Sequence, residues 1–360
     1  MNARTILCHS LQVIAAMAVA ISPVGCEQQR GPDAGRAQAE AGALRAALTG
    51  TVTIGGSSTM LPISRIVADA FEKQHQGVKV VVEGSGTGAG FKKFCAGQLD
   101  ATGASRPINA GESRECSANR IEFIEMPVAF DSLSVVVHAG NSFVECLTVA
   151  ELKRMWEPAA EGRVTRWNQI RSNFPNQPLT LFGPGAESGT FDYFTLAIVG
   201  TESMSRHDYT KSDDDEALAD GVAADANALG YFGYAYYAAN KERLKLVSVD
   251  GGSGCIAPTL ETVTENRYQP LARPIFIYVS KSAAIRPEVK ALAHFYVAPE
   301  NARFATSVGD MPLPIVALLS AARRLDKGVT GSVFGGHGSV VGVTADVLQD
   351  EDKIKNALVR

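Results

Sequence analysis

Apolar and polar positions follow two patterns along most of the chain, one typical of strands and one of helices. Short runs of β-branched residues, such as TVTI from Thr51 and VKVVVE from Val78, give way to stretches in which apolar residues recur three or four positions apart. The clearest such stretch extends from Leu61 to His75. Short strands that alternate with amphipathic helices predict an α/β fold with largely parallel strands.

The same order of strand, turn and helix returns further along the chain. LSVVVHAG predicts a strand, and LTVAELKRMW after it an amphipathic helix capped by Thr148. PLTLFG, the turn GPGAESGT and the helix FDYFTLAIV form another unit, and the strand PIFIYVS precedes the helix PEVKALAHFYV. The Gly-rich segment from Thr330 predicts a tail that is extended or loosely packed.

The first fifty residues predict export rather than structure. Arg4, an apolar run from Leu11 to Ile21 and small residues up to Cys26 are typical of a signal peptide over residues 1–25. An apolar run of roughly eleven residues is too short to span a bilayer, which takes about twenty. Cys26 favours a lipoprotein whose acylated cysteine follows cleavage, although an ordinary cleaved signal also fits. Residues 26–50, poor in large apolar side chains, predict a lipid-anchored tether.

Four cysteines remain for the folded part, and they permit three pairings in an oxidising compartment. We prefer Cys95 with Cys116, which are close in sequence, and Cys146 with Cys255. Four buried free thiols are the alternative.

Composition narrows the function. With 360 residues, 46% of them apolar, the chain can bury a large core. Its formal net charge of -4, from 34 basic and 38 acidic residues, gives no overall field for nucleic acid. An anionic ligand would therefore need a local site.

Three clusters of Gly, Ser and Thr follow a strand and open a helix: Gly56 to Thr59, Gly84 to Gly88, and Ser188 to Thr190. Helix starts carry spare N–H donors and the positive end of the helix dipole, and hydroxyls add donors without charge. One cluster alone is an ordinary cap or turn. Three at the carboxyl ends of strands predict a small-anion site.

Other chemistries lack their motifs. SGTGAG does not have the glycine spacing of a dinucleotide-binding fingerprint, and no Lys follows it as in the phosphate-binding loop of an NTPase. No GxSxG motif surrounds the candidate serines. The six histidines form no metal-ligand pair, and the acidic run Asp213 to Glu216 lacks EF-hand spacing and predicts a helix cap instead. We expect no metal, no cofactor and no catalytic residue.

Six segments carry a family resemblance. GSSTMLP, EGSGTGAGF, GASRPI, PVAFDSLSVVV, ESGTFDYF and ALGYFGYAYY occur in the order found in phosphate-binding proteins of ABC-type phosphate importers, which the chain resembles from Thr51 to Leu325. The resemblance implies a type II periplasmic binding protein: two α/β lobes, a ligand cleft and two hinge crossovers. We place lobe one at 51–137 plus 270–325, lobe two at 138–269, and a tail at 326–360, with hinges near Val137 and Leu271.

The resemblance also implies the ligand set. Phosphate would be bound by the lobe-one residues Ser58, Thr59, Ser85 and Ser105, and by the lobe-two residues Ser188, Gly189 and Thr190. The chain departs from the more familiar branch of the family, which has Asp where Arg106 stands and Arg where Pro184 stands.

Two charged residues complete the expected site. We expect Arg106 to supply the guanidinium for the oxyanion, a surface ion pair being the alternative. Asp131 is the candidate acceptor for the proton of phosphate, which sulfate lacks, and a turn or helix cap is its alternative.

The function that follows is high-affinity binding of unchanged inorganic phosphate outside the cytoplasmic membrane, with delivery to the permease subunits of an ABC importer. We expect a lipid-anchored monomer in the periplasm or at the cell surface. The alternatives are another tetrahedral oxyanion, such as sulfate or molybdate, or a serine-dependent phosphate-ester hydrolase, for which no His lies within the Ser/Thr motifs.

Overall fold

The computed structural model describes residues 47–345, 347–349 and 352–354. The predicted signal peptide, Cys26 and most of the predicted tether lie outside the described residues. The first strand begins at Thr49, two residues before the expected start of the fold. None of the helices in the described ranges combines the length and the apolar character that crossing a membrane requires.

The strands form one mixed sheet of twelve strands, whose main path runs in the order β2, β1, β3, β11, β4, β8, β6, β7. Parallel pairing joins β1 to β2 and to β3, because helical crossovers connect them. β11 lies antiparallel to β3 and β4 in the middle of the sheet. The α/β prediction is confirmed, with antiparallel strands added at the centre.

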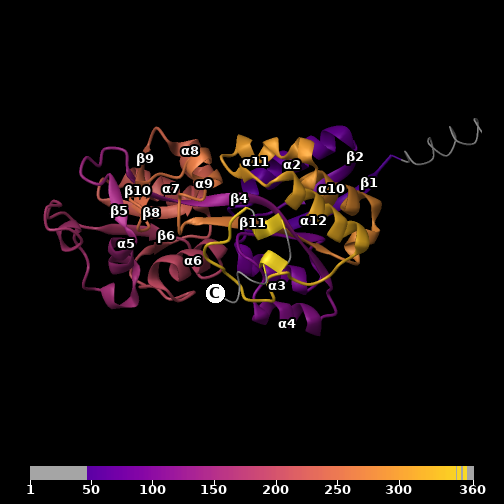
Figure 1. The fold of residues 1–360 in the computed structure, drawn as a ribbon, viewed down its shortest axis with the longest axis horizontal. Helices are drawn as coiled ribbons and strands as arrows, with labels where there is room; N and C mark the ends of the chain where they lie inside the picture. Colours follow the sequence, from indigo (N-terminus) through magenta and orange to yellow (C-terminus); the bar gives the residue numbers. More distant parts are fainter. Residues whose placement is uncertain (1–46, 346, 350–351, 355–360) are drawn as a thin grey trace, which may run out of the picture. The chain divides into compact units, whose positions relative to one another are not determined.

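Lobe one, as we use the term, is the half of the sheet around β1 together with its helices. Its strands are β1 (Thr49–Gly56), β2 (Gly77–Val82), β3 (Ala101–Ala104), β11 (Ala272–Ser280), β12 (Met311–Pro312) and the first part of β4 (Phe123–His138). Its helices are α2 (Leu61–Gln74), α3 (Thr87–Cys95), α4 (Ala110–Ala118), α10 (Pro287–Val297), α11 (Arg303–Ser307) and α12 (Ile315–Lys327). In Figure 1, α2 and α11 lie on one side of this half, and α3 and α4 on the other.

Lobe two is the half that begins with the second part of β4. Its other strands are β5 (Cys146–Thr148), β6 (Thr180–Gly183), β7 (Thr210–Lys211), β8 (Ala228–Gly233), β9 (Leu244–Asp250) and β10 (Cys255–Ile256). Its helices are α5 (Val149–Trp156), α6 (Gly189–Phe194), α7 (Asp215–Ala224), α8 (Tyr234–Asn240) and α9 (Leu260–Thr264). α6 runs directly into a π-helical turn, Thr195–Val199. Single 3-10 turns lie at Pro158–Ala160, Trp167–Gln169, Ala283–Ile285, Pro299–Asn301 and Val347–Gln349.

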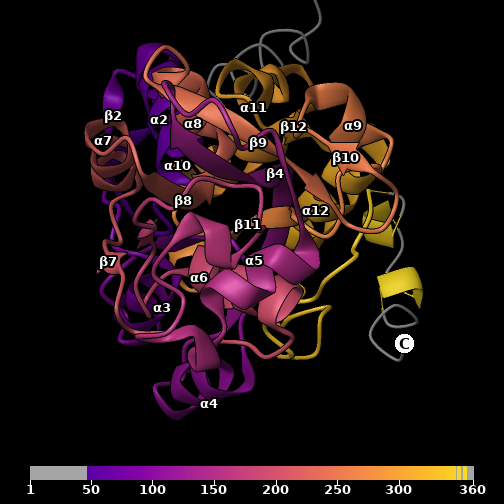
Figure 2. The same cartoon turned by 90° about the vertical axis from the view of Figure 1, so that its left-hand side faces the viewer.

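β4 is the longest strand and passes from one lobe into the other, as Figures 1 and 2 show. It pairs with β11 up to Ser132 and with β8 from Leu133 onward. The change of partner therefore lies five residues before the expected hinge at Val137. Beside it, the N–H of Leu133 donates to the carbonyl of Leu271, so that both expected crossovers run next to each other. The domain limits themselves stay a prediction.

Local signals explain several of these elements. Thr148 and Glu151 form a reciprocal capping box at the start of α5, as the sequence predicted for Thr148. Asp214 caps α7, which confirms the cap expected of the acidic run. Both preferred disulfides, Cys95 with Cys116 and Cys146 with Cys255, are formed.

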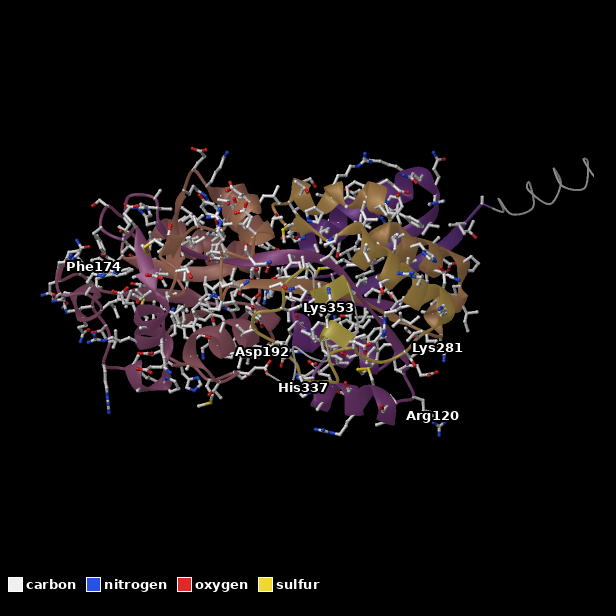
Figure 3. The ribbon with its side chains drawn as sticks, in the orientation of Figure 1. Arg120, Phe174, Asp192, Lys281, His337 and Lys353 are labelled. Atoms are coloured by element: carbon white, nitrogen blue, oxygen red, sulfur yellow. A yellow bond between two sulfur atoms is a disulfide. The ribbon has the colours of Figure 1, made fainter. Side chains whose placement is uncertain are left out.

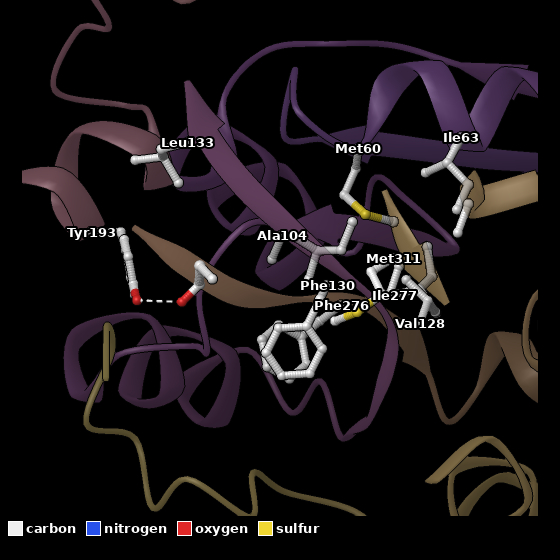
Figure 4. Packing of buried hydrophobic residues seen from close by; sticks show 14 of the residues in the cluster. Met60, Ile63, Ala104, Val128, Phe130, Leu133, Tyr193, Phe276, Ile277 and Met311 are labelled. Carbon is white, nitrogen blue, oxygen red and sulfur yellow. Dashed lines mark hydrogen bonds between the residues drawn. The ribbon is translucent and has the colours of Figure 1, made fainter. Parts of the chain in front are cut away.

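One apolar core extends through both lobes. Figure 4 shows part of it, where Phe130 and Phe276 pack beneath Met60 and Met311. Lobe two also contains aromatic packing: Tyr231 stacks on Phe194 with ring centroids 3.7 Å apart. The core thus supports the strands from which the candidate site is built.

The tail is irregular, but its described part is not loosely packed, contrary to the expectation from its glycines. Phe334 is buried and meets Phe276 edge to face at 5.5 Å. The N–H of Val333 donates to the buried carboxylate of Glu125 in lobe one. The N–H of Ser339 donates to Glu202 in lobe two. The tail therefore contacts both lobes.

Candidate functional site

The turn between β1 and α2 presents Ser58 and Thr59 at the start of the helix. A Cβ on Gly56, whose φ is +112°, would lie 2.2 Å from the carbonyl oxygen of Gly103, so glycine is required there. The Ser57 N–H donates to that same carbonyl at 2.9 Å. These contacts hold the turn against the end of β3, and both Ser58 and Thr59 are buried.

The second loop, between β2 and α3, is tied to the first. The Ser85 N–H donates to the carbonyl of Gly56 at 2.8 Å. The Ser85 hydroxyl oxygen is buried and has no hydrogen-bond partner in the described part of the chain. Two residues on, Thr87 opens α3, and its hydroxyl lies 3.1 Å from that of Ser105, which follows β3. Three lobe-one loops thus meet at one place.

The lobe-two loop closes on this place from the opposite side. Ser188 caps α6 by accepting a hydrogen bond from the Thr190 N–H at 3.1 Å. A Cβ on Gly189 would lie 2.6 Å from the Ser105 hydroxyl and 2.7 Å from the Thr87 hydroxyl, so only glycine permits this approach. The hydroxyls of Thr190 and Thr59 are 3.0 Å apart. The structure therefore brings the expected hydroxyl loops of both lobes together.

Ser58 lies at the mouth of this cluster. Its hydroxyl donates to the carbonyl of Asp213 at 2.7 Å, and its own carbonyl accepts from the Tyr236 hydroxyl at 2.8 Å. A cavity of about 480 Å³ opens here, lined by Ser58 and Ser85 of lobe one and by the acidic run before α7. Among the described residues, no group of side chains is arranged to hold a metal ion.

Arg273, which the sequence analysis missed, lies in the middle of the site. Its guanidinium donates twice to Asp131 Oδ2, at 2.9 and 3.1 Å, once to Thr190 Oγ1 at 2.7 Å and once to the Gly189 carbonyl at 2.9 Å. Arg273 and Asp131 stand opposite each other in the antiparallel pairing of β11 and β4. The available signal was an arginine at the head of an otherwise apolar strand.

Arg106 does not present a comparable free edge to the hydroxyl cluster. It donates through NH1 and NH2 to both oxygens of Glu112, at 2.8 Å each, and through Nε to Asp192 Oδ2 at 2.7 Å. Burial disfavours its charge, but the hydrogen bonds and charges of Glu112 and Asp192 outweigh that cost and raise the pKa of Arg106. Its expected contact with the anion stays a prediction, and Arg273 has the more suitable geometry.

Asp131 lies beside the hydroxyl cluster, and it is paired with the guanidinium of Arg273. Its Oδ1 is buried and accepts no hydrogen bond from the described residues. Burial raises the pKa of Asp131, while the charge of Arg273 and the peptide groups of Tyr234 and Ser132 act in the opposite direction. The carboxylate thus retains one oxygen that can accept a proton or a hydrogen bond.

Two further buried carboxyls surround this pair. Burial raises the pKa of Asp215 to about 7, and the negative charge of Asp131 adds to the shift. Burial and Asp131 likewise raise the pKa of Asp310 well above its usual range. Of the three, only Asp131 pairs with Arg273 in the described part of the chain, and the carboxyl oxygens of Asp215 and Asp310 have no hydrogen-bond partner there. Placing a further negative charge on either of these two is therefore costly.

Comparisons with known proteins identify the family. Residues 41–300 match the family described as the PBP superfamily domain. The chain is 48% identical to the protein SphX of Synechocystis over 83% of this chain and 88% of that one. It is 31% identical to the phosphate-binding protein PstS of Staphylococcus aureus, over 72% and 77% of the two chains.

This chain belongs to the PstS-like phosphate-binding protein family. A crystal structure of a possible phosphate binding protein from Planctomyces limnophilus is 41% identical, with a TM-score of 0.58 over 78% of this chain and 99% of that one. A substrate-binding protein from Clostridium perfringens, 22% identical, shares the fold with a TM-score of 0.64 over 74% and 100% of the two chains. The PstS-like fold is the expected one: a type II periplasmic binding protein with two α/β lobes.

Proposed function

We propose that this protein binds inorganic phosphate between its lobes, leaves it chemically unchanged and delivers it to an ABC-type importer outside the cytoplasmic membrane. The observation that carries the proposal is the meeting of uncharged donors from both lobes around a single shared guanidinium. Thr59, Thr87 and Ser105 come from lobe one, and Ser188 and Thr190 from lobe two.

The donors suit a small oxyanion because they replace its hydration shell without excess charge. Hydroxyls and helix-start N–H groups turn toward an anion with little reorganisation. The Arg273 fork adds charged donors, and Asp131 is the one carboxylate that hydrogen-bonds to it among the described residues. We propose Arg273 as the ligand arginine, together with the predicted set Ser58, Thr59, Ser85, Ser105, Ser188, Gly189 and Thr190.

Asp131 supplies the basis for selectivity. Phosphate carries at least one proton at neutral pH, and that P–OH group can donate to the unpartnered Oδ1 of Asp131. Fully ionised sulfate offers only lone pairs there and meets a like charge. Phosphate and sulfate are both tetrahedral, so the shape of the pocket alone does not separate them and the acceptor decides between them.

Calorimetric titration of ligand-stripped protein with phosphate, sulfate and molybdate at two pH values tests the proposal. Phosphate is expected to bind at least about tenfold more tightly than either rival, or about 1.4 kcal/mol. Equal or tighter binding of sulfate or molybdate, or no binding of phosphate, would overturn it.

The hydrolase alternative makes a different prediction. A serine nucleophile needs a base within hydrogen-bond reach. Among the described residues, the Ser58 hydroxyl donates to a peptide carbonyl, that of Ser105 lies beside a threonine hydroxyl and that of Ser188 accepts from a peptide N–H, so none of these partners is a base. Incubation with phosphomonoesters is therefore expected to give no enzyme-dependent turnover.

Export and anchoring belong to the same proposal. We propose that residues 1–25 are removed and that Cys26 carries a lipid that keeps the monomer at the membrane. In cells expressing Cys26→Ser, the protein is expected to leave the membrane fraction, with wild type as the control. Retention of the variant in that fraction would exclude the lipid anchor.

A further inference from the structure

The structure assigns Arg106 the role of an inter-lobe latch, a positioning residue that holds the closed cleft through Asp192 instead of contacting the anion. This inference rests on the proposed function, because it concerns how the closed, ligand-bound state is stabilised. It assigns to the arginine of the GASRPI segment a role other than the one its place in the sequence suggests.

The lobe-one side of the latch is rigid before the lobes meet. Glu112 opens α4 in a reciprocal capping box with Asn109, and its Oε2 accepts from the Asn109 N–H at 2.9 Å. The same carboxylate receives two donors of Arg106, and a third N–H of the guanidinium reaches the Pro107 carbonyl at 3.1 Å. All of these partners belong to lobe one, so the guanidinium is preorganised with its Nε edge facing outward.

The lobe-two side is mounted on the helix that also carries the proposed ligand hydroxyls. Asp192 lies in the first turn of α6, two residues after Thr190. Its Oδ2 accepts from Arg106 Nε at 2.7 Å, and its Oδ1 accepts from the Ser203 hydroxyl at 2.6 Å. Figure 3 shows Asp192 between the two halves of the molecule. When α6 moves toward the anion, Asp192 moves toward Arg106.

The carboxylates around Arg106, more than its hydrogen-bond count, argue against a direct anion contact. A guanidinium has five N–H donors, and within the described residues four of those of Arg106 are directed at Glu112, Pro107 and Asp192. Two full carboxylates already neutralise its single charge. What Arg106 gains from closure is the third charge-assisted contact, which is buried because Arg106 is only 3% exposed.

Energetically, the latch shifts the balance between open and closed protein. A hydrogen bond between charged groups that exists only in the closed state stabilises that state alone, and a ligand that binds the closed state gains the same amount in affinity. Because the contact forms after the anion has entered, its loss is expected in the dissociation rate and not in the association rate.

The test compares two identical substitutions. Asp192→Asn removes the charge of the inter-lobe partner, whereas Asp208→Asn removes a carboxylate from Arg206, an equally buried arginine whose contacts all lie in lobe two. Stopped-flow and calorimetric titrations use the oxyanion that wild type binds best. Asp192→Asn is expected to raise Kd at least about tenfold through faster dissociation, and Asp208→Asn to change it less than about twofold.

Direct contact between Arg106 and the anion predicts a different result. If Arg106 contacted the anion, Asp192→Asn would remove a competing negative charge and leave binding unchanged or tighter, and either outcome would overturn the latch. Arg106→Lys provides a second variant in case Asp192→Asn does not fold. It keeps the buried charge on Glu112 but cannot serve both carboxylates, so faster dissociation is again expected and an unchanged rate would overturn the proposal. A wild-type protein that binds none of the oxyanions would instead refute the proposed function.

Discussion

Arg106 and Arg273 are both buried lobe-one arginines that reach across to α6, yet their surroundings differ. Arg106 is hydrogen-bonded to two carboxylates, Glu112 and Asp192, at 2.7 to 2.8 Å, and a third, that of Glu202, lies 4.0 Å from its Nε. Arg273 hydrogen-bonds to one carboxylate, that of Asp131. Its other donors are directed at the Thr190 hydroxyl and the Gly189 carbonyl. Burial therefore does not distinguish a ligand arginine from a structural one. The number of carboxylates around each guanidinium does.

The difference is one of available charge. An arginine between two carboxylates has no net positive field to offer an incoming anion. An arginine with one carboxylate and several neutral partners can exchange those neutral partners for anionic oxygens at little cost. On this ground we propose different roles for the two arginines, Arg273 at the ligand and Arg106 at closure.

Replacing Arg273 is expected to have the largest effect. Arg273→Met leaves Asp131 buried without its cation, which costs about 3 to 5 kcal/mol of stability, and it removes the proposed ligand charge. Phosphate binding should fall by at least about a thousandfold, or about 4 kcal/mol. Calorimetry and urea unfolding measure the two effects. Arg273→Lys, which keeps the charge, separates them, because it should fold well and still bind poorly. Binding within tenfold of wild type in the Lys variant would break the comparison.

Asp215 tests how much a further buried negative charge near Arg273 and Asp131 costs in stability. Its pKa is raised to about 7 in the folded protein, so the folded state holds the proton more tightly than the unfolded chain does. Stability from this group is therefore complete below about pH 4, falls as the pH rises and is fully lost above about pH 7. Relative to wild type, Asp215→Asn should gain about 3 kcal/mol between pH 5 and pH 8. Urea unfolding at both pH values measures this, and parallel pH profiles would contradict it.

Asp131→Asn is expected to lower both selectivity and stability, because it also leaves the buried Arg273 without its carboxylate partner. The amide keeps the shape of the side chain but presents a neutral group to the ligand and to Arg273. The preference for phosphate over sulfate should fall by about tenfold, equivalent to about 1.4 kcal/mol. Competitive titration measures the ratio directly. An unchanged ratio would remove Asp131 from the discriminating role.

The smallest effect is expected from the exposed counterpart of the latch. Lys92 of α3 and Glu187 of lobe two also pair across the cleft, at 2.6 Å, but their side chains are 62% and 40% exposed. Such pairs contribute little and are screened by salt. Lys92→Gln should raise Kd less than about threefold at low salt, with no difference at 0.5 M salt. A rise in Kd as large as that of Asp192→Asn would mean that the burial of the Arg106–Asp192 pair does not strengthen it.

Local patterns predicted much of the site because its parts are local. The strand, turn and helix around Ser58, the loop containing Ser85 and the SGT turn at Ser188 each carry their signal within a dozen residues. Glycines at positions 56 and 189 were visible in the sequence as turn residues. Each of these glycines also leaves room for a second loop, which would come too close to a Cβ at that position. That loop is far away in the chain, so the sequence around the glycine does not reveal it.

The sequence by itself determined the α/β alternation, the hydroxyl loops at helix starts and the family to which they belong, since each is written in short-range spacing. Only the tertiary structure decided which carboxylates and hydroxyls surround each arginine. Arg273 meets Asp131 through an antiparallel register between strands some 140 residues apart, and Arg106 meets Asp192 only where the two lobes touch. Such long-range pairing is set by how whole sheets pack, so no local pattern contains it.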